Sequence, residues 1–230
     1  MVAVKAQREK PESELGIKFK EEIFGNHPYS RTLETMAEDV KNLNISDVKN
    51  FLNTQLNQDS LIIGIAGNIT ENEAIKLLDD VFGKLPQTSD TKTIDKPILN
   101  LEAGTTFIER ETAQIVSQFA VLGTTRLAAD FYPLYIANHI FGGAGLTSRL
   151  SLATREKEGL TYGVYTYLST DDNTPLILGG FSCVPENYEK MKTILLEQMS
   201  LFASKGITEK ELINAKRYLL SSFNLRFKST

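Results

Sequence analysis

Hydrophobic residues recur at helical spacing along several stretches of the chain. In residues 12–24, Leu15, Phe19 and Ile23 fall on one face of a helix, and the Gly, Asn and Pro of "GNHPYS" end the pattern. The same spacing predicts further helices over residues 44–56, 71–85, 128–143, 143–159, 186–206 and 208–230. Helices therefore account for much of the expected structure.

Side chains that can cap a helix stand at the start of three of these segments. Ser46 is a candidate N-cap for the segment 44–56. Thr70 with Glu73, and Thr208 with Glu211, have the spacing of a capping box. These residues predict where the three helices begin.

Four other stretches have the hydrophobic pattern of β-strands. Residues 60–68 form a continuous apolar run of strand length, and residues 105–123 alternate like one or two strands. Residues 160–170 and 175–184 are rich in aromatic and β-branched side chains and predict a strand pair.

The order of these elements predicts an α+β protein. Residues 87–98 are polar and lack a periodic apolar set, which makes them the expected linker. We expect a first domain over residues 1–86 and a second over 99–230, each with a mainly antiparallel sheet packed against long helices. The chain would then contain the end of one domain and most of a second.

Composition and charge exclude several classes of function. A net charge of -4 with scattered basic residues argues against a nucleic-acid partner. No run is long and apolar enough to span a membrane. The single cysteine, Cys183, lies in a strand-like run and is expected to be buried and inert rather than redox-active.

Metal and nucleophile motifs are absent from the sequence. The two histidines, His27 and His139, lie far apart, so no H-x-x-E-H helix is present, and each is expected to be structural. The glycines of "FGGAGLTS" lack the spacing and the Lys-Ser or Lys-Thr pair of a phosphate loop. Carboxylates lie in loops or on expected exposed helix faces, and no Ser, Asp and His grouping can be recognised.

The most informative stretch is "SRLSLATREKEGLTYGVYTYL", residues 148–168, where a helical pattern changes to a strand pattern at Gly159. On the residues alone, Arg155 belongs to a charged helix end and Tyr162 is a surface aromatic of a strand. In the alternative interpretation, the guanidinium and the phenol are two donors on rigid elements, able to hold a peptide carbonyl and its developing oxyanion.

Residues 138–169, "NHIFGGAGLTSRLSLATREKEGLTYGVYTYLS", resemble the second-domain signature of the pitrilysin, insulysin and mitochondrial processing peptidase family of zinc endopeptidases. The stretches "FGNHPYS", "SDVKNFLNTQLNQDSLIIGIAGNIT" and "VFGKLP" are similar to the end of that family's first domain. "ITEKELINAKRYLLSSF" is similar to a late helix of its second domain.

The resemblance implies two α+β domains that close around an extended peptide. The first domain of the family binds zinc through H-x-x-E-H and a distant Glu, and the second supplies an Arg and a Tyr that hold substrate. Arg155 and Tyr162 match this pair. The rest of the signature is expected to line the substrate, through Gly142, Gly143, Ser148 and Arg149. Peptide binding would occur by strand addition to a sheet edge.

The sequence departs from the family in its metal ligands. H-x-x-E-H is absent, and Val2 and Ala3 stand about where the third ligand is expected. The chain is therefore expected to bind no metal and to be inactive alone, with zinc in a partner subunit or an upstream segment. The family's closing strand and helix are also absent from the end of this sequence, and a homo-oligomer is a further possibility for the partner.

Three interpretations follow from the resemblance. The chain is the substrate-binding part of a zinc metallopeptidase, a truncated piece of an ordinary active zinc peptidase, or a non-enzymatic scaffold subunit like the core proteins of the respiratory cytochrome bc1 complex. The signature is more typical of bacterial than of mitochondrial members, and a periplasmic location is expected for the full-length form.

Overall fold

The computed structural model divides the chain into two compact units. The first, called the helical unit, runs from Thr32 to Asp95; the second, called the sheet unit, joins the residues up to Arg31 with those from Lys96 onward. The described residues are 10–88, 94–171 and 173–225. The expected linker lies at the later boundary of the helical unit, whereas residues before Arg31 cluster with the later part of the chain. The assignment of residues 1–86 and 99–230 to two family-type domains stays a prediction.

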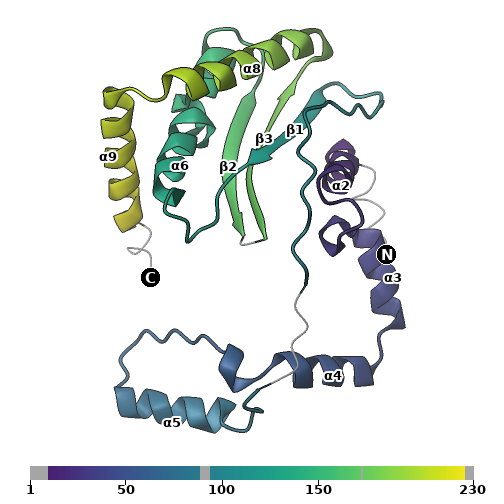
Figure 1. The fold of residues 1–230 in the computed structure, drawn as a ribbon, viewed down its shortest axis with the longest axis vertical. Coiled ribbons are helices and arrows are strands. Elements are labelled where there is room, and N and C mark those ends of the chain that lie inside the picture. Colours follow the sequence, from purple (N-terminus) through teal and green to yellow (C-terminus); the bar gives the residue numbers. More distant parts are fainter. Residues whose placement is uncertain (1–9, 89–93, 172, 226–230) are drawn as a thin grey trace. The chain divides into compact units, whose positions relative to one another are not determined.

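The sheet unit is built on three antiparallel strands in the order β1-β3-β2 (Figure 1). Their bounds are β1 Ile115–Leu122, β2 Gly163–Asp171 and β3 Thr174–Cys183. The predicted pair over residues 160–170 and 175–184 is confirmed. In the stretch 105–123, only β1 forms a strand.

The register of the strands separates two faces of the sheet. In β3, Phe181 lies opposite Ser117 of β1 and Val164 of β2, so these three residues share one face. The neighbouring Gly180 lies opposite Tyr165, on the other face. The first face is called the core face below and the second the open face.

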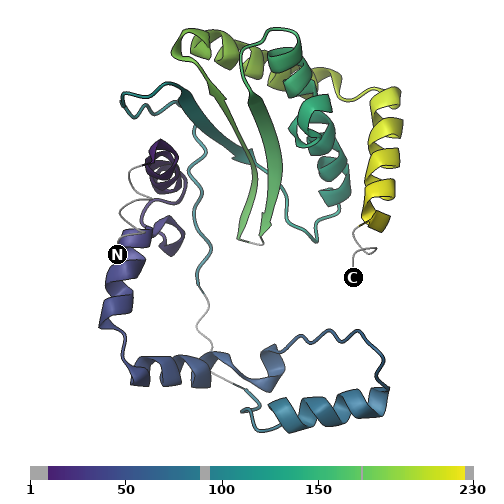
Figure 2. The ribbon, with the colours of Figure 1, turned by 180° about the vertical axis from the view of Figure 1, so that it is seen from behind.

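Helices cover the core face. The helices of the sheet unit are α2 Pro11–Phe24, α6 Phe131–Asn138, α7 Arg149–Ser151, α8 Tyr188–Lys205 and α9 Glu209–Leu225. The main core cluster consists of buried residues from the strands, α8 and the segments between them: Phe141, Leu150, Leu160, Val164, Phe181, Cys183, Met191 and Leu195. α9 lies beside α6 in both views (Figures 1 and 2). α2 packs beside β1 and borders the open face.

The chain also contains tighter and wider helical turns, and some of them interrupt the predicted helices. The 3-10 turns are Pro28–Ser30, Gln58–Ser60, Gly145–Thr147 and Pro185–Asn187. The π turns are His139–Gly143 and Leu152–Glu156. The predicted helices over residues 128–143 and 143–159 are therefore broken, and each contains a π turn of the kind that often occurs at functional sites.

The helical unit contains α3 Leu33–Asn42, α4 Ile45–Gln55 and α5 Glu71–Phe82. The capping box of Thr70 and Glu73 is confirmed at the start of α5. The prediction of Ser46 as an N-cap is wrong, because Asn44 caps α4 and forms a reciprocal capping box with Asp47.

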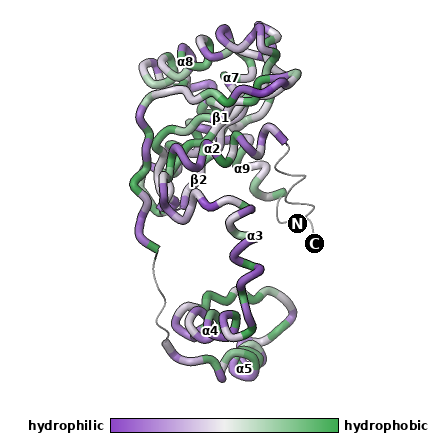
Figure 3. Tube along the Cα trace, turned by 90° about the vertical axis from the view of Figure 1, so that its right-hand side faces the viewer, coloured by the Kyte–Doolittle hydropathy of each residue, from purple (hydrophilic) through white to green (hydrophobic). Residues whose placement is uncertain are grey.

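The prediction of a strand over residues 60–68 is also wrong. The segment 61–66 is hydrophobic (Figure 3), but it has no helical or strand assignment, and Ile62 is fully exposed. A strand needs a neighbouring strand to satisfy its backbone groups, and the described residues pair none with this segment. Apolar character alone therefore did not determine a sheet here.

Candidate functional site

The turn between the π turn Leu152–Glu156 and β2 is fixed by buried backbone groups. Thr154 is buried and donates its hydroxyl to the Leu150 carbonyl at 2.7 Å. Leu160 N–H donates to the Thr154 carbonyl at 2.9 Å, and Gly159 N–H donates to the Arg155 carbonyl at 3.0 Å. Gly159 has a φ of 64°, a conformation that glycine adopts readily. The helix therefore ends in a defined geometry just before the strand.

Thr161 fixes the start of β2. Its hydroxyl lies 2.8 Å from the Gly163 carbonyl oxygen and 2.6 Å from that of Ser182, and it accepts the Gly163 N–H at 3.0 Å. Leu160 and Thr161 are buried, whereas the side chain that follows, Tyr162, is 77% exposed. The buried pair thus directs the phenol of Tyr162 into solvent.

Arg155 lies on the other side of this turn and has little engagement with the protein. Its side chain is 37% exposed, and among the described residues its ion-pair partner is Glu156, with Nε and Oε1 separated by 4.0 Å. The nearby Glu158 is paired with Lys190 instead, at 2.6 Å. That bond lowers the pKa of the Glu158 carboxyl. Within the described residues, the guanidinium of Arg155 therefore has only this one long ion-pair contact.

Arg149, also in the predicted site, is engaged by the protein itself. Its Nε and Nη2 donate to the two carboxylate oxygens of Glu211, at 2.5 and 2.6 Å, and Nη2 also donates to the Gly206 carbonyl at 2.9 Å. The guanidinium lies 4.9 Å from the centre of the Phe202 ring. The bond from Arg149 is the main cause that lowers the pKa of Glu211 to about 2. Arg149 therefore connects α7 to the start of α9.

The other three predicted substrate residues lie at packing positions. A Cβ on Gly142 would lie 2.4 Å from the Thr166 hydroxyl, and one on Gly143 would lie 3.0 Å from the Asn138 amide nitrogen. Ser148 is buried, donates to the Gly145 carbonyl at 2.8 Å and caps α7. These contacts show how the loop approaches β2, while Arg155 and Tyr162 remain accessible.

The described residues do not provide a zinc site. Among them, no three His, Cys, Asp or Glu side chains cluster as metal ligands. His27 Nδ1 accepts the Tyr29 N–H at 3.3 Å, and His139 stacks on Tyr218 at 5.2 Å between ring centres. Burial lowers the pKa of His139. Val2 and Ala3, the expected position of the third ligand, lie outside the described residues.

Two further features bear on chemistry. Cys183 is buried in the core, and this burial raises the pKa of its thiol, so it is a poor nucleophile. In the described segments, no helix combines the length and the hydropathy needed to cross a bilayer.

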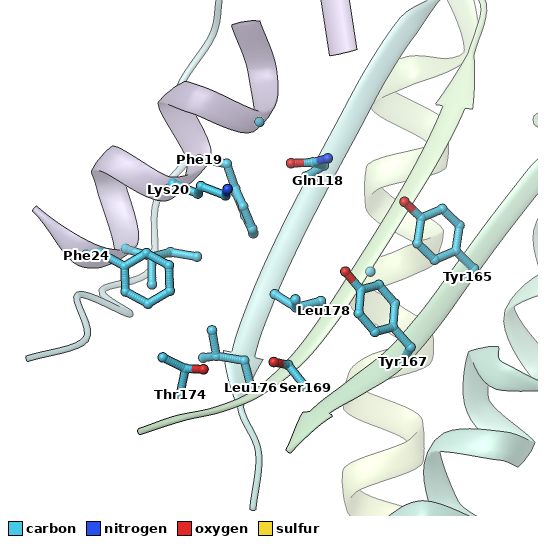
Figure 4. A pocket seen from close by; sticks show the side chains of 13 residues that line it. Phe19, Lys20, Phe24, Gln118, Tyr165, Tyr167, Ser169, Thr174, Leu176 and Leu178 are labelled. Carbon is cyan, nitrogen blue, oxygen red and sulfur yellow. The ribbon is translucent and has the colours of Figure 1, made fainter. Parts of the chain in front are cut away.

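Three polar residues on the open face were not singled out from the sequence. Gln118, Tyr165 and Tyr167 line a pocket beside α2 (Figure 4). The alternation of tyrosines at positions 165 and 167 was the available signal, since residues two apart in a strand share a face. Tyr165 and Tyr167 lie on β2 and Gln118 on β1, so the pocket spans the open face of the sheet.

Comparisons with known proteins agree on one family. Residues 42–219 match the family described as "Peptidase M16 inactive domain". A curated relative, the uncharacterized zinc protease YmxG of Bacillus subtilis, is 28% identical over 211 residues, which cover 90% of this chain and 50% of the relative. The chain thus spans about half the length of the curated relatives it matches.

Solved structures show the same fold. The peptidase M16 inactive domain from Pseudomonas fluorescens aligns with a TM-score of 0.83 at 24% identity, covering 96% of this chain and 53% of that one. A chain of Complex III2 from Candida albicans aligns with a TM-score of 0.74 at 16% identity, covering 97% of this chain and 54% of that one. At these identities the likeness establishes the fold alone.

Proposed function

The chain belongs to the peptidase M16 family, matching its inactive domain, and we propose that it holds an extended peptide for a zinc-bearing domain without cleaving the peptide itself. The zinc-bearing domain would be a partner subunit, a second copy of the protein or an upstream segment that carries H-x-x-E-H. Zinc, when bound in that domain, would polarise the scissile carbonyl and activate water.

The observation that supports this proposal most directly is the difference between the two arginines of the signature. Arg149 is held by a bidentate ion pair to Glu211. Arg155 has a single long contact to Glu156, and the described residues offer it no closer acid. A guanidinium that is positioned by a rigid helix end but not satisfied by the protein is suited to bind a ligand acceptor.

Tyr162 supplies the second donor. Its hydroxyl makes no hydrogen bond within the described residues, and its backbone is fixed by Thr161. We infer that Arg155 and Tyr162 donate to the same peptide carbonyl. Such donors stabilise the negative charge that develops on the carbonyl oxygen in the transition state, which is how they would assist a nucleophile supplied by another domain.

The other predicted substrate residues take a supporting role in this proposal. Gly142 and Gly143 allow the loop to approach β2, and Ser148 and Arg149 fix the start of the segment that carries Arg155. Their substitution is expected to act through the geometry of the turn rather than through direct contact with peptide.

A scaffold role is the second candidate, and the likeness to a chain of Complex III2 favours it. That likeness concerns the fold. A scaffold has no use for an accessible Arg155 and Tyr162, so peptide binding that depends on both side chains separates the two candidates. The third interpretation, a piece of an ordinary active peptidase, would be recognised by H-x-x-E-H in the coding sequence upstream.

The experiment is a fluorescence-anisotropy titration of a labelled extended peptide, drawn from a small library, with the 230-residue chain. The test variants are Arg155→Met and Tyr162→Phe. The control is Lys157→Met, which removes one positive charge from an exposed side chain two positions after Arg155. We expect each test variant to weaken binding about tenfold, as expected for the loss of one charge-assisted or buried hydrogen bond, and the control to bind like the parent. Equal binding by all four proteins would refute the proposal.

A further inference from the structure

A pocket of about 220 Å³ lies between α2 and the open face of the sheet (Figure 4). Its lining comes from α2 and from all three strands, and all of it belongs to the sheet unit. This α2–sheet pocket faces away from the main core cluster, because Tyr165 and Tyr167 lie on the face opposite Val164 and Phe181.

The walls of the pocket are largely apolar. Phe19 and Phe24 of α2 face Leu176 and Leu178 of β3 across it (Figure 4). An apolar cavity of about 150 Å³ is known to accept benzene, whereas sites for small-molecule ligands begin at about 300 Å³. The pocket therefore has room for one ring-sized side chain.

Unpartnered polar groups surround these apolar walls. They are the hydroxyls of Tyr165, Tyr167 and Ser169, the amide of Gln118 and the ammonium of Lys20. Within the part of the chain that the structure describes, none of these side-chain groups has a hydrogen-bond or ion-pair partner. Tyr165 and Tyr167 are about half exposed, at 48% and 50%, and their hydroxyls point across the sheet toward Gln118 (Figure 4). An apolar pocket with a few convergent polar groups is the usual form of a binding site.

We propose that the α2–sheet pocket binds one aromatic side chain of the extended peptide; this inference rests on the proposed function above. The rings of Phe19 and Phe24 provide apolar and aromatic contact. Tyr165, Tyr167 and Gln118 can hydrogen-bond either a phenol or the peptide main chain. Lys20 is the one charged residue among those lining the pocket, so it disfavours a Lys or Arg side chain there.

The test uses one labelled extended peptide of Val, Thr and Ser, in three versions whose central residue is Phe, Ala or Lys. Each version is titrated with the parent chain and with Gly16→Leu. Gly16 lines the pocket on α2, and a Cβ added there meets no atom within 4 Å, so the position has room for the start of a leucine side chain, which is expected to occupy part of the pocket. The substitution also raises helix propensity, which protects the fold. Glu21→Leu places the same side chain at an exposed position of α2 that is not among the residues lining the pocket.

We expect the Phe peptide to bind the parent at least about tenfold more tightly than the Ala or Lys peptide, because its ring is removed from water. Gly16→Leu should abolish this preference, while Glu21→Leu should keep it. Arg155→Met should weaken all three peptides to the same extent.

Three results would overturn the inference, and they differ in what they say of the proposed function. If the three peptides bind the parent equally and Arg155→Met weakens the binding of each, the aromatic pocket is refuted and the proposed function is retained. A failure of every peptide to bind would refute both. A preference for Phe that persists in Gly16→Leu would place the aromatic side chain elsewhere on the chain and would also refute the pocket.

Discussion

The Arg149–Glu211 ion pair provides a quantitative test of how the site segment is held. Glu211→Gln removes the negative charge while keeping an amide oxygen that can accept from Arg149 and from the Thr208 N–H. The folded chain lowers the pKa of Glu211 from 4.5 to about 2, chiefly through the hydrogen bond from Arg149. At about 1.36 kcal/mol for each pKa unit, this difference corresponds to at most about 3.4 kcal/mol.

Solvent reduces that upper bound. The side chains of Arg149 and Glu211 are 21% and 28% exposed, so part of their attraction is screened. We therefore expect Glu211→Gln to lower the free energy of local unfolding around α9 by about 2 kcal/mol, which is roughly a 30-fold change in the opening equilibrium.

The pH dependence follows from the sign of the shift. Because folding lowers the pKa of Glu211, its contribution is fully present above about pH 4.5 and is lost as the pH falls toward about 2. Hydrogen exchange of the α9 amides measures this directly, as the ratio of rates in the variant and the parent at each pH. The ratio should be about 30 near neutral pH and should shrink steadily below about pH 4.5. A ratio near one at neutral pH, or one that does not change on acidification, would refute the reasoning.

Three further substitutions or reactions test the packing around the site. Gly142→Ala places a Cβ 2.4 Å from the Thr166 hydroxyl and should lower the free energy of unfolding, measured in urea, by about 1–3 kcal/mol. The control is Gly163→Ala, whose Cβ meets no atom within 4 Å and which should lower the free energy of unfolding by a smaller amount. Thr161→Val removes the buried hydroxyl that joins Gly163 to β3, and it should lower the free energy of unfolding by about 1–3 kcal/mol. It should also weaken peptide binding, because the turn before Tyr162 loses its support. Unchanged peptide binding would show that the geometry of this turn does not affect the site. Cys183 should react with a thiol reagent only as fast as the chain opens, and rapid modification of the native chain would contradict its burial.

Much of the sheet unit could be predicted from the sequence because its signals were local. The aromatic and β-branched alternation of residues 160–170 and 175–184 gave the β2–β3 pair, and the spacing of Thr208 and Glu211 gave the start of α9. Arg155 and Tyr162 were predicted as site residues because the short stretch "REKEGLTY" resembles the family signature, and this assignment stays a prediction. Each of these features depends on residues close together in the sequence.

The features that were missed depend on contacts between distant segments. The apolar run 60–68 predicted a strand, but strand formation depends on a partner that periodicity does not reveal. Arg149 could not be distinguished from Arg155 without knowing that Glu211, 62 positions later in the chain, lies against it. The α2–sheet pocket likewise joins residues of α2 to residues of β2 and β3, and no local motif predicts that meeting.

Arg155 and Tyr162 are proposed to act together on one peptide carbonyl. A double-mutant cycle on peptide affinity, with Arg155→Met, Tyr162→Phe and the double variant, tests this proposal most directly. If both donors serve the same carbonyl, the loss in the double variant should differ from the sum of the single losses by at least about 0.5 kcal/mol. Additive losses would assign the two side chains to separate contacts, and the absence of any loss would contradict the account of this chain as a peptide-holding domain.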